Sequence, residues 1–550
     1  MSESTAPPPL PTAPKDDLAD FEEGLAKKAR ATRWVVLALA LVVMAAGGCF
    51  WADWSARQPD EPTELEKVMS GPFVDVQMEW FRSLALTSQY NRSLQTEQSE
   101  KLDLAVGALL DRLDEVAPNL KEPIAAMLGT LRELDQMAFL MDEGTGALRE
   151  KIHAVNEVLS GLEPRFYVDP EAFQGILDKD YLTAVMLLVY EVLGTEIFTP
   201  ADESIPPVEL LVVQRIDTLP PDASRHGYVR QEDSQAAFIL QKNATNFVTD
   251  YLLPSMQRPD MAFENLFEGR LPDDLKRPYR ALLELVELEL RNVAGAETAL
   301  FEETVELLAE RGKIYGKIER SAERLGVRLR RPDGLLWPRG LLWKLLEENV
   351  ALIKKGQELA SRKDLDHLSE IQHILGDAAH REVLVAVTDH LVGAVGVHEA
   401  RHVLDVREGH AAGDCIRRRV RLRDQDENFW TDVELEARAY LTQLVETPSA
   451  AYMTLLSLVN HLYQRSGTVN FYAARTILHS LAYNDDEDDI PDRAWEYLEE
   501  VAIRLAAMER EDLSTRARAL YESCFGEYVG LTRATPDRAA ASGGCSVAPR

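Results

Sequence analysis

Apolar residues recur at spacings of three and four along most of the chain, which is the pattern of amphipathic helices. In residues 101–117 the side chains of Leu102, Val106, Leu109 and Leu113 form one such stripe. The same pattern predicts further helices over residues 121–141, 147–162, 278–293, 299–324 and 342–360. The spacing therefore predicts a mainly α protein.

One region breaks this helical pattern. Residues 208–216, 227–231 and 236–241 are short, richer in valine and isoleucine, and separated by turn residues. Such segments predict three strands, although the first segment also fits the end of a helix. We therefore expect a small β-sheet within an otherwise helical protein.

An uncharged apolar run near the N-terminus, residues 34–51, is long enough to cross a bilayer. Trp34, Trp51 and Trp54 lie at its ends, where aromatic residues anchor a helix at the membrane interface. Basic residues precede the run, so the positive-inside rule places the N-terminus in the cytoplasm. We expect a single-pass anchor over residues 34–54 and an extracytoplasmic, periplasmic main domain.

The same apolar run allows two other interpretations. The sequence AGGC permits a lipoprotein signal with lipidation at Cys49, which also tethers the chain to a membrane. The run could instead be a core helix of a folded domain, but its flanking aromatic and basic residues argue against this.

Together these patterns divide the chain into segments. We expect a disordered cytoplasmic leader (1–33), a transmembrane anchor (34–54), a helical region (55–205), a mixed α/β subdomain (206–298), a helical domain (299–530) and a disordered tail (531–550). The leader is assigned from its proline-rich start, PPPLPTAP. The expected fold is one N-terminal transmembrane helix followed by a multi-helix domain with a small sheet.

The chain is strongly acidic, with 92 Asp and Glu against 60 Lys and Arg and a formal net charge of −32. An acidic surface repels phosphate backbones, so we expect no nucleic-acid partner. The four cysteines form no C-x-x-C pair, which excludes a cysteine zinc ribbon. Cys415 and Cys524 either form a disulfide in an oxidising compartment or remain as two thiols.

A polar cluster interrupts the apolar segment 381–409, which predicts a largely buried helix that ends at Gly409. His398 and His402 are four residues apart, so both rings project from one side of the helix and can bind one metal ion. Glu399 lies beside that position, where it can take a proton from the attacking water and return it to a leaving amine. This is the H-E-x-x-H motif of zinc metallopeptidases. The alternative is two histidines that share a helix face without a metal.

A zinc site that hydrolyses a substrate needs three protein ligands and an open position. The metzincin pattern needs a glycine at position 405 and a histidine at position 408, but the chain has Asp405 and Glu408. Residues 429–446, FWTDVELEARAYLTQLVE, predict a second helix that offers Glu434 and Glu436. We therefore expect the third ligand on this second helix.

The sequence HEARH, followed along the chain by ELEARAYL, resembles the gluzincin group of metallopeptidases. In that group the third zinc ligand is a glutamate on a second helix, often within E-x-x-A, as in the membrane-bound heat-shock and prenyl-protein peptidases. The resemblance implies a zincin-like helical domain that binds Zn²⁺ through His398, His402 and Glu434. Glu436 is the alternative third ligand, and Glu399 is the general base and acid.

One position departs from the pattern of this group. The group commonly has an aspartate four residues after the ligand glutamate, where it orients a zinc-binding histidine, and this chain has Arg438 there. Asp405 or Asp432 could take that role, and catalytic competence depends on it. Candidates for a donor that stabilises the oxyanion are Tyr440, Tyr452, His461, Tyr463, His479 and Tyr483.

These observations predict a membrane-anchored zinc metallopeptidase, an endopeptidase that cleaves protein or peptide substrates. The alternative is a non-catalytic, membrane-tethered helical scaffold or sensor with a degenerate or structural metal site. The peptidase hypothesis requires that His398, His402 and a glutamate of the second helix converge on one point.

Overall fold

The computed structural model describes residues 63–87, 92–134, 146–162, 165–177, 180–216, 227–229, 237–257, 273–327, 329, 335, 337, 339–409, 415–420, 427–463, 468–483 and 494–534. The chain divides into two compact units, Met1–Lys67 and Val68–Arg550. The predicted leader, the predicted anchor over residues 34–54 with Cys49, and residues 535–550 lie outside the described residues.

The structure is mainly helical. The helical segments up to residue 375 are α2 (Glu64–Ser70), α3 (Pro72–Thr87), α4 (Arg92–Val116), α5 (Pro118–Glu133), α7 (Gly146–Ser160), α8 (Gln241–Phe247), the π-helix η1 (Val248–Leu252), α9 (Leu253–Gln257), α11 (Asp273–Ala294), α12 (Thr298–Leu325), α13 (Arg339–Ile353) and α14 (Arg362–Leu375). The later segments are α15 (Ala378–Glu408), α16 (Cys415–Val420), α17 (Glu427–Glu446), the 3₁₀-helix η2 (Pro448–Ala450), α18 (Ala451–Tyr463), α19 (Val469–Tyr483), α20 (Ala494–Ala506) and α21 (Arg510–Phe525).

The predicted apolar stripes correspond to α4, α5, α7, α11, α12 and α13. Leu102, Leu109 and Leu113 of α4 are buried, as the pattern over residues 101–117 predicts. The helix predicted over residues 342–360 ends earlier, because α13 stops at Ile353. The chain turns there through Gly356, whose φ of 77° is a left-handed conformation that glycine adopts without strain.

The strands form one mixed sheet. They are β1 (Phe166–Leu177), β2 (Asp180–Pro200), β3 (Val208–Arg215), β4 (Gly227–Val229), β5 (Ala237–Leu240) and β6 (Leu531–Arg533). Their order is β1-β2-β3-β5-β4, with β6 beside β2, and every pair is antiparallel except β3–β5. The three predicted strands are confirmed as β3, β4 and β5. The expected disordered tail is wrong at its start, because residues 531–533 form β6.

The long β1–β2 hairpin was not predicted, since residues 55–205 were expected to be helical. All residues from Val185 to Tyr190 of β2 are buried, so both faces of this strand are covered. On one face, Met186 and Leu188 pack with Phe81 of α3. A strand covered on both faces lacks the alternation of polar and apolar residues by which a strand is recognised in sequence.

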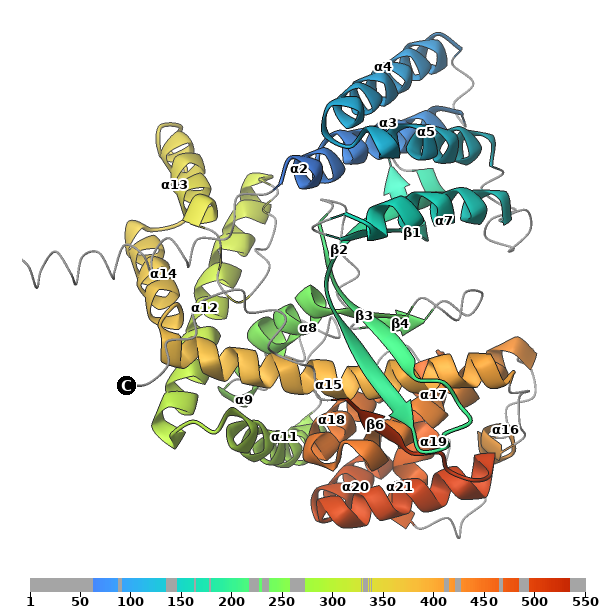
Figure 1. The fold of residues 1–550 in the computed structure, drawn as a ribbon. Coiled ribbons are helices and arrows are strands. Elements are labelled where there is room, and N and C mark those ends of the chain that lie inside the picture. The colour runs from blue at the N-terminus through green and yellow to red at the C-terminus, as the bar shows by residue number, and fades with distance from the viewer. Residues whose placement is uncertain are drawn as a thin grey trace, which may run out of the picture. The chain divides into compact units, whose positions relative to one another are not determined.

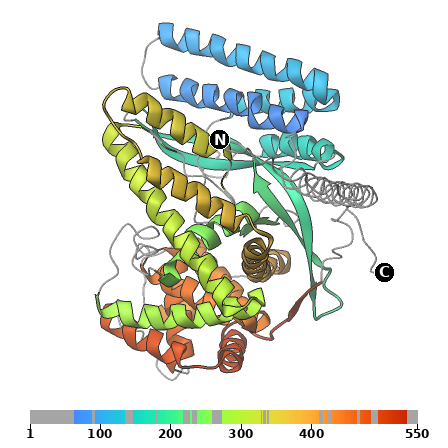
Figure 2. The same ribbon diagram turned by 90° about the vertical axis from the view of Figure 1, so that its left-hand side faces the viewer.

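Helix α15 lies against the sheet through β3, β4 and β5 (Figure 1). In Figure 2 α15 is seen end-on, with the sheet on one side and the C-terminal helices on the other. Asp377 caps its N-terminus and Gly409 ends it with a φ of 60°, so the predicted stop at Gly409 is confirmed. One continuous hydrophobic core extends from Phe198 of β2 to Leu531 of β6 and contains this helix.

By length and composition α15 is also apolar enough to cross a membrane. However, 72% of its most apolar stretch is buried inside the structure. Its apolar residues therefore serve as the core of a folded domain, and among the described residues no other helix meets the same test.

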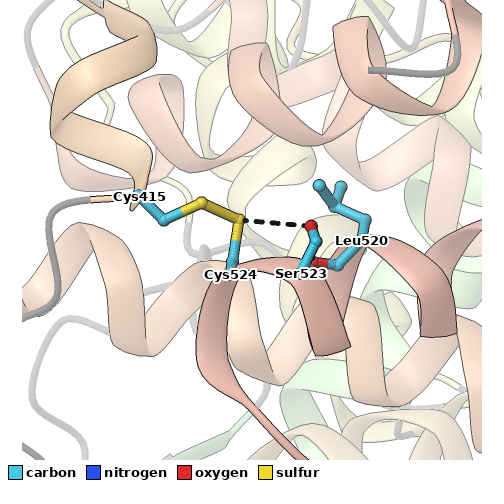
Figure 3. Close-up of a disulfide and its surroundings, with 4 residues drawn as sticks. All are labelled: Cys415, Leu520, Ser523 and Cys524. Carbon is cyan, nitrogen blue, oxygen red and sulfur yellow. Dashed lines mark hydrogen bonds between the residues drawn. A yellow bond between two sulfur atoms is a disulfide. The ribbon is translucent and has the colours of Figure 1, made fainter. Parts of the chain in front are cut away.

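A disulfide joins Cys415 of α16 to Cys524 of α21 (Figure 3). Of the two possibilities that the sequence allowed for these cysteines, the structure contains the disulfide. The two cysteines are 109 residues apart in sequence, and the loop between them contains the whole of α17. The bond therefore holds α21 to the short helix that follows α15.

Candidate metal centre

Two imidazole rings from α15 meet on the side of this helix that faces α17. His398 and His402 lie one turn apart, as the i, i+4 spacing predicts, with ring centroids 4.8 Å apart. Their Nε2 atoms are 3.1 Å apart. Both nitrogens therefore point to one common position.

The third member of this group is Glu436 of α17. One carboxylate oxygen lies 3.4 Å from Nε2 of His398, and the other lies 3.6 Å from Nε2 of His402. Three ligands at about 2.0–2.1 Å from a tetrahedral metal ion lie roughly 3.4 Å from one another. The donor atoms of this group all lie within 4.8 Å of one another, close enough that the group could hold a metal ion.

Glu434, the first choice for the third ligand, does not belong to this group. A helix turns by about 100° per residue, so side chains two positions apart point to nearly opposite sides. The match of E-x-x-A to Glu434 therefore placed the third ligand two residues before Glu436, the glutamate that lies beside the histidines. Every residue from Ala437 to Val445 of α17 is buried, so no apolar stripe indicates which face of the helix meets α15.

The charge states of Glu436 and His402 favour the binding of a metal cation. Burial alone would raise the pKa of Glu436, but its hydrogen bond with His398 and the nearby histidines lower that pKa to about 2. Burial lowers the pKa of His402 to about 4, against the attraction of Glu436. Glu436 is therefore ionised and His402 is neutral, which are the states that bind a metal cation.

The pKa of His398 is shifted in the opposite direction to that of His402. Burial would lower the pKa of His398, but its hydrogen bond with Glu436 and the charges of Glu436 and Glu399 raise it overall. The charges of Glu436 and Glu399 therefore favour a proton on His398, and a metal ion that binds here competes with that proton.

Glu399, the predicted general base, lies close to this group. It is 5% exposed, and its charge raises the pKa of both His398 and Tyr440. Tyr440 follows Glu436 by one helical turn on α17, and its ring centroid lies 4.5 Å from that of His398. Its hydroxyl group is 2.7 Å from Nε2 of His461 on α18. Two of the six candidate oxyanion donors, Tyr440 and His461, thus border the centre.

Two arginines bind the carboxylate of Asp405, and its charge also opposes the lowering of the pKa of His402. Nε of Arg401 donates a hydrogen bond to Asp405 over 2.9 Å, and Nε of Arg438 lies 3.3 Å from the same oxygen. Arg438 therefore contacts a carboxylate of α15. It does not occupy the position at which the gluzincin pattern has an aspartate. Because Glu436 is the glutamate of the group, the residue four positions later is Tyr440.

The fold and the site define a mainly helical protein with a small mixed sheet and a centre of two histidines and one glutamate that could hold a metal ion. No protein-family model, curated protein or solved structure matches the chain. The residues of the centre are therefore the basis on which a function is inferred.

Proposed function

We propose that this protein is a zinc-dependent metallopeptidase. The observation that carries the proposal is the convergence of His398, His402 and Glu436, with donor atoms 3.1–3.6 Å apart. Two imidazoles and one carboxylate are a ligand set of catalytic zinc sites, which keep a fourth position open. A zinc ion held there would polarise a peptide carbonyl and make water a nucleophile at neutral pH.

The surrounding residues supply the proton transfers and the charge stabilisation. Glu399 takes the proton of the attacking water and returns it to the amine that leaves when the peptide bond breaks. The hydroxyl group of Tyr440 and the ring of His461 are donors at the edge of the centre that can stabilise negative charge on the carbonyl oxygen. Burial, with the charges of Glu436 and Glu399, raises the pKa of Tyr440 and keeps its phenol protonated.

The proposal also includes location and substrate. We infer that the anchor over residues 34–54, or a lipid on Cys49, tethers the protein to a membrane with the metal centre outside the cytoplasm. The disulfide Cys415–Cys524 supports this location, because disulfides persist in oxidising compartments. The substrates are then protein or peptide chains cleaved internally.

The test is hydrolysis of an unfolded protein by the purified full chain, together with its zinc content. Glu399→Gln should retain one zinc per chain and lose about 10²–10⁴-fold in rate, the usual contribution of a general base. Glu436→Gln should lose zinc, whereas Glu434→Gln, the matched control on the same helix, should keep it. A wild-type protein that binds no zinc would refute the proposal. Zinc binding without hydrolysis would favour the scaffold or sensor.

A further inference from the structure

A second buried charged cluster lies behind the metal centre, and the proposed reaction does not use it. Arg401 and Asp405 of α15 and Arg438 of α17 have exposures of 1%, 2% and 6%. Burying charged groups costs several kcal/mol for each ion, and such pairs are often less stabilising than apolar residues. The cluster is therefore better explained by a role in positioning than by stability alone.

The cluster connects the two helices that carry the metal-binding residues. Asp405 lies three positions after His402, and Arg438 lies two positions after Glu436. The 3.3 Å contact between Asp405 and Arg438 is a charged link between α15 and α17. The charges of Asp405 and Arg401 also act on the pKa of His402, so the cluster lies within electrostatic reach of the centre. The second arginine, Arg401, binds Asp405 from within α15 and holds its carboxylate in place.

Aromatic residues of α21 cover this link. The guanidinium carbons of Arg401 and Arg438 each lie 5.7 Å from the ring centroid of Tyr521. Arg438 also lies 5.3 Å from the ring centroid of Phe525 and donates a hydrogen bond to the hydroxyl of Tyr521 over 3.3 Å. Cys524, which lies between these two aromatic residues in sequence, forms the disulfide to α16 (Figure 3).

We propose that the Asp405–Arg438 link is a positioning device that fixes α17 against α15 and so places Glu436 at its distance from the two histidines. The histidines share one helix, and their separation needs no such link. Only the glutamate comes from the other helix, and a metal ligand must be held within about 0.5 Å of its productive position. Loss of the link therefore removes the third ligand selectively. This inference rests on the proposed metal centre.

The test compares Arg438→Met with Arg311→Met in the full chain, titrated with cobalt(II) alone. Arg311 is a matched control: it is fully buried, pairs with Asp250 at 3.0 Å and lies 4.6 Å from the ring centroid of Trp337. Arg438→Met should bind cobalt about 10–100-fold more weakly, the usual effect of losing a residue that orients a ligand. Arg311→Met should bind it as the wild type does.

The visible spectrum of bound cobalt separates positioning from general destabilisation. The spectrum of Arg438→Met should shift toward that of Glu436→Gln, whereas the spectrum of Arg311→Met should not change. Asp405→Asn, which has the same shape as the wild type, should give the same shift if Arg438→Met does not fold.

Each outcome of this experiment decides one question. Wild-type affinity and spectrum in Arg438→Met or Asp405→Asn would overturn the positioning role while leaving the metal centre intact. An equal loss in Arg311→Met would also overturn it, because the effect would then follow from burial of any arginine. A wild-type protein that binds no cobalt would refute the metal centre itself, and with it this inference.

Discussion

At Gly396 the helix with the histidines packs closely against the sheet. A Cβ atom added at Gly396 would lie 2.6 Å from Cζ of Phe198 on β2 and 3.2 Å from Cδ1 of Ile239 on β5. Carbon atoms in contact normally lie about 3.5–4.0 Å apart. Both neighbours are fully buried, so neither has space to move into. Gly396→Ala therefore forces α15 and the sheet apart.

The magnitude follows from two opposing effects. Replacing a glycine by alanine in a helix favours folding by about 0.8–1 kcal/mol. Overpacking a core costs about 1–3 kcal/mol. Gly396→Ala should therefore lower the free energy of unfolding by up to roughly 2 kcal/mol, although alanine is the better helix former.

Gly393, one turn earlier on α15, is the matched control. A Cβ atom there would lie 2.5 Å from Nη1 of Arg533 and meet no backbone atom. Arg533 donates two hydrogen bonds to the largely buried Glu196, but its own side chain is long and 33% exposed, so the end of this flexible side chain can shift. Gly393→Ala should then be neutral or stabilise the fold by up to about 1 kcal/mol.

Urea unfolding followed by circular dichroism measures both variants. The gain in helix propensity is common to the two, so the difference between their free energies of unfolding isolates overpacking, about 1–3 kcal/mol. Equal unfolding midpoints at equal m-values would refute the close packing of α15 on Phe198.

Two further predictions concern stability. Glu289 accepts hydrogen bonds from the backbone N–H groups of Tyr452 and Met453, and burial raises its pKa from 4.5 to about 8. The folded protein then keeps a proton that the unfolded chain releases, so its free energy of unfolding in urea should fall between pH 4.5 and 8, and Glu289→Gln should remove this slope. Replacing Cys415 and Cys524 by serine should lower the free energy of unfolding by about 5 kcal/mol, because the disulfide closes a long loop between residues 109 positions apart. An unchanged midpoint of urea unfolding would exclude the disulfide.

The sequence predicts most helices because their signal is local. The stripe that contains Leu109 and Leu113 needs only the helical period and a polar opposite face. The pairing of His398 with His402 is local in the same way, since any helix brings positions i and i+4 to one side. Residues 185–190 of β2 have no such signal, because this part of the strand is buried on both faces.

The third ligand is not predictable from local spacing, because it depends on how α17 is rotated about its own axis. That rotation is set by contacts with several other helices, chiefly α15, α19 and α21. Glu434 and Glu436 are both on α17, and by sequence spacing either could be the third ligand. Only the packing decides between them, and it brings Glu436 to the histidines.

If the centre binds zinc as we propose, this rotation also changes the significance of Arg438. If Glu434 were the ligand, Arg438 would occupy the place of a supporting carboxylate and the centre would lack a group that orients His398. With Glu436 in the group, that place belongs to Tyr440, whose ring lies edge-on to His398 and whose hydroxyl group is held by His461. The ring of Tyr440 restricts the orientation of the His398 imidazole, as a carboxylate would. Unlike a carboxylate, it adds no negative charge, and Glu436 and Glu399 already supply negative charge near His398. Under the proposed function, the departure from the gluzincin pattern is therefore a different way to hold the same histidine.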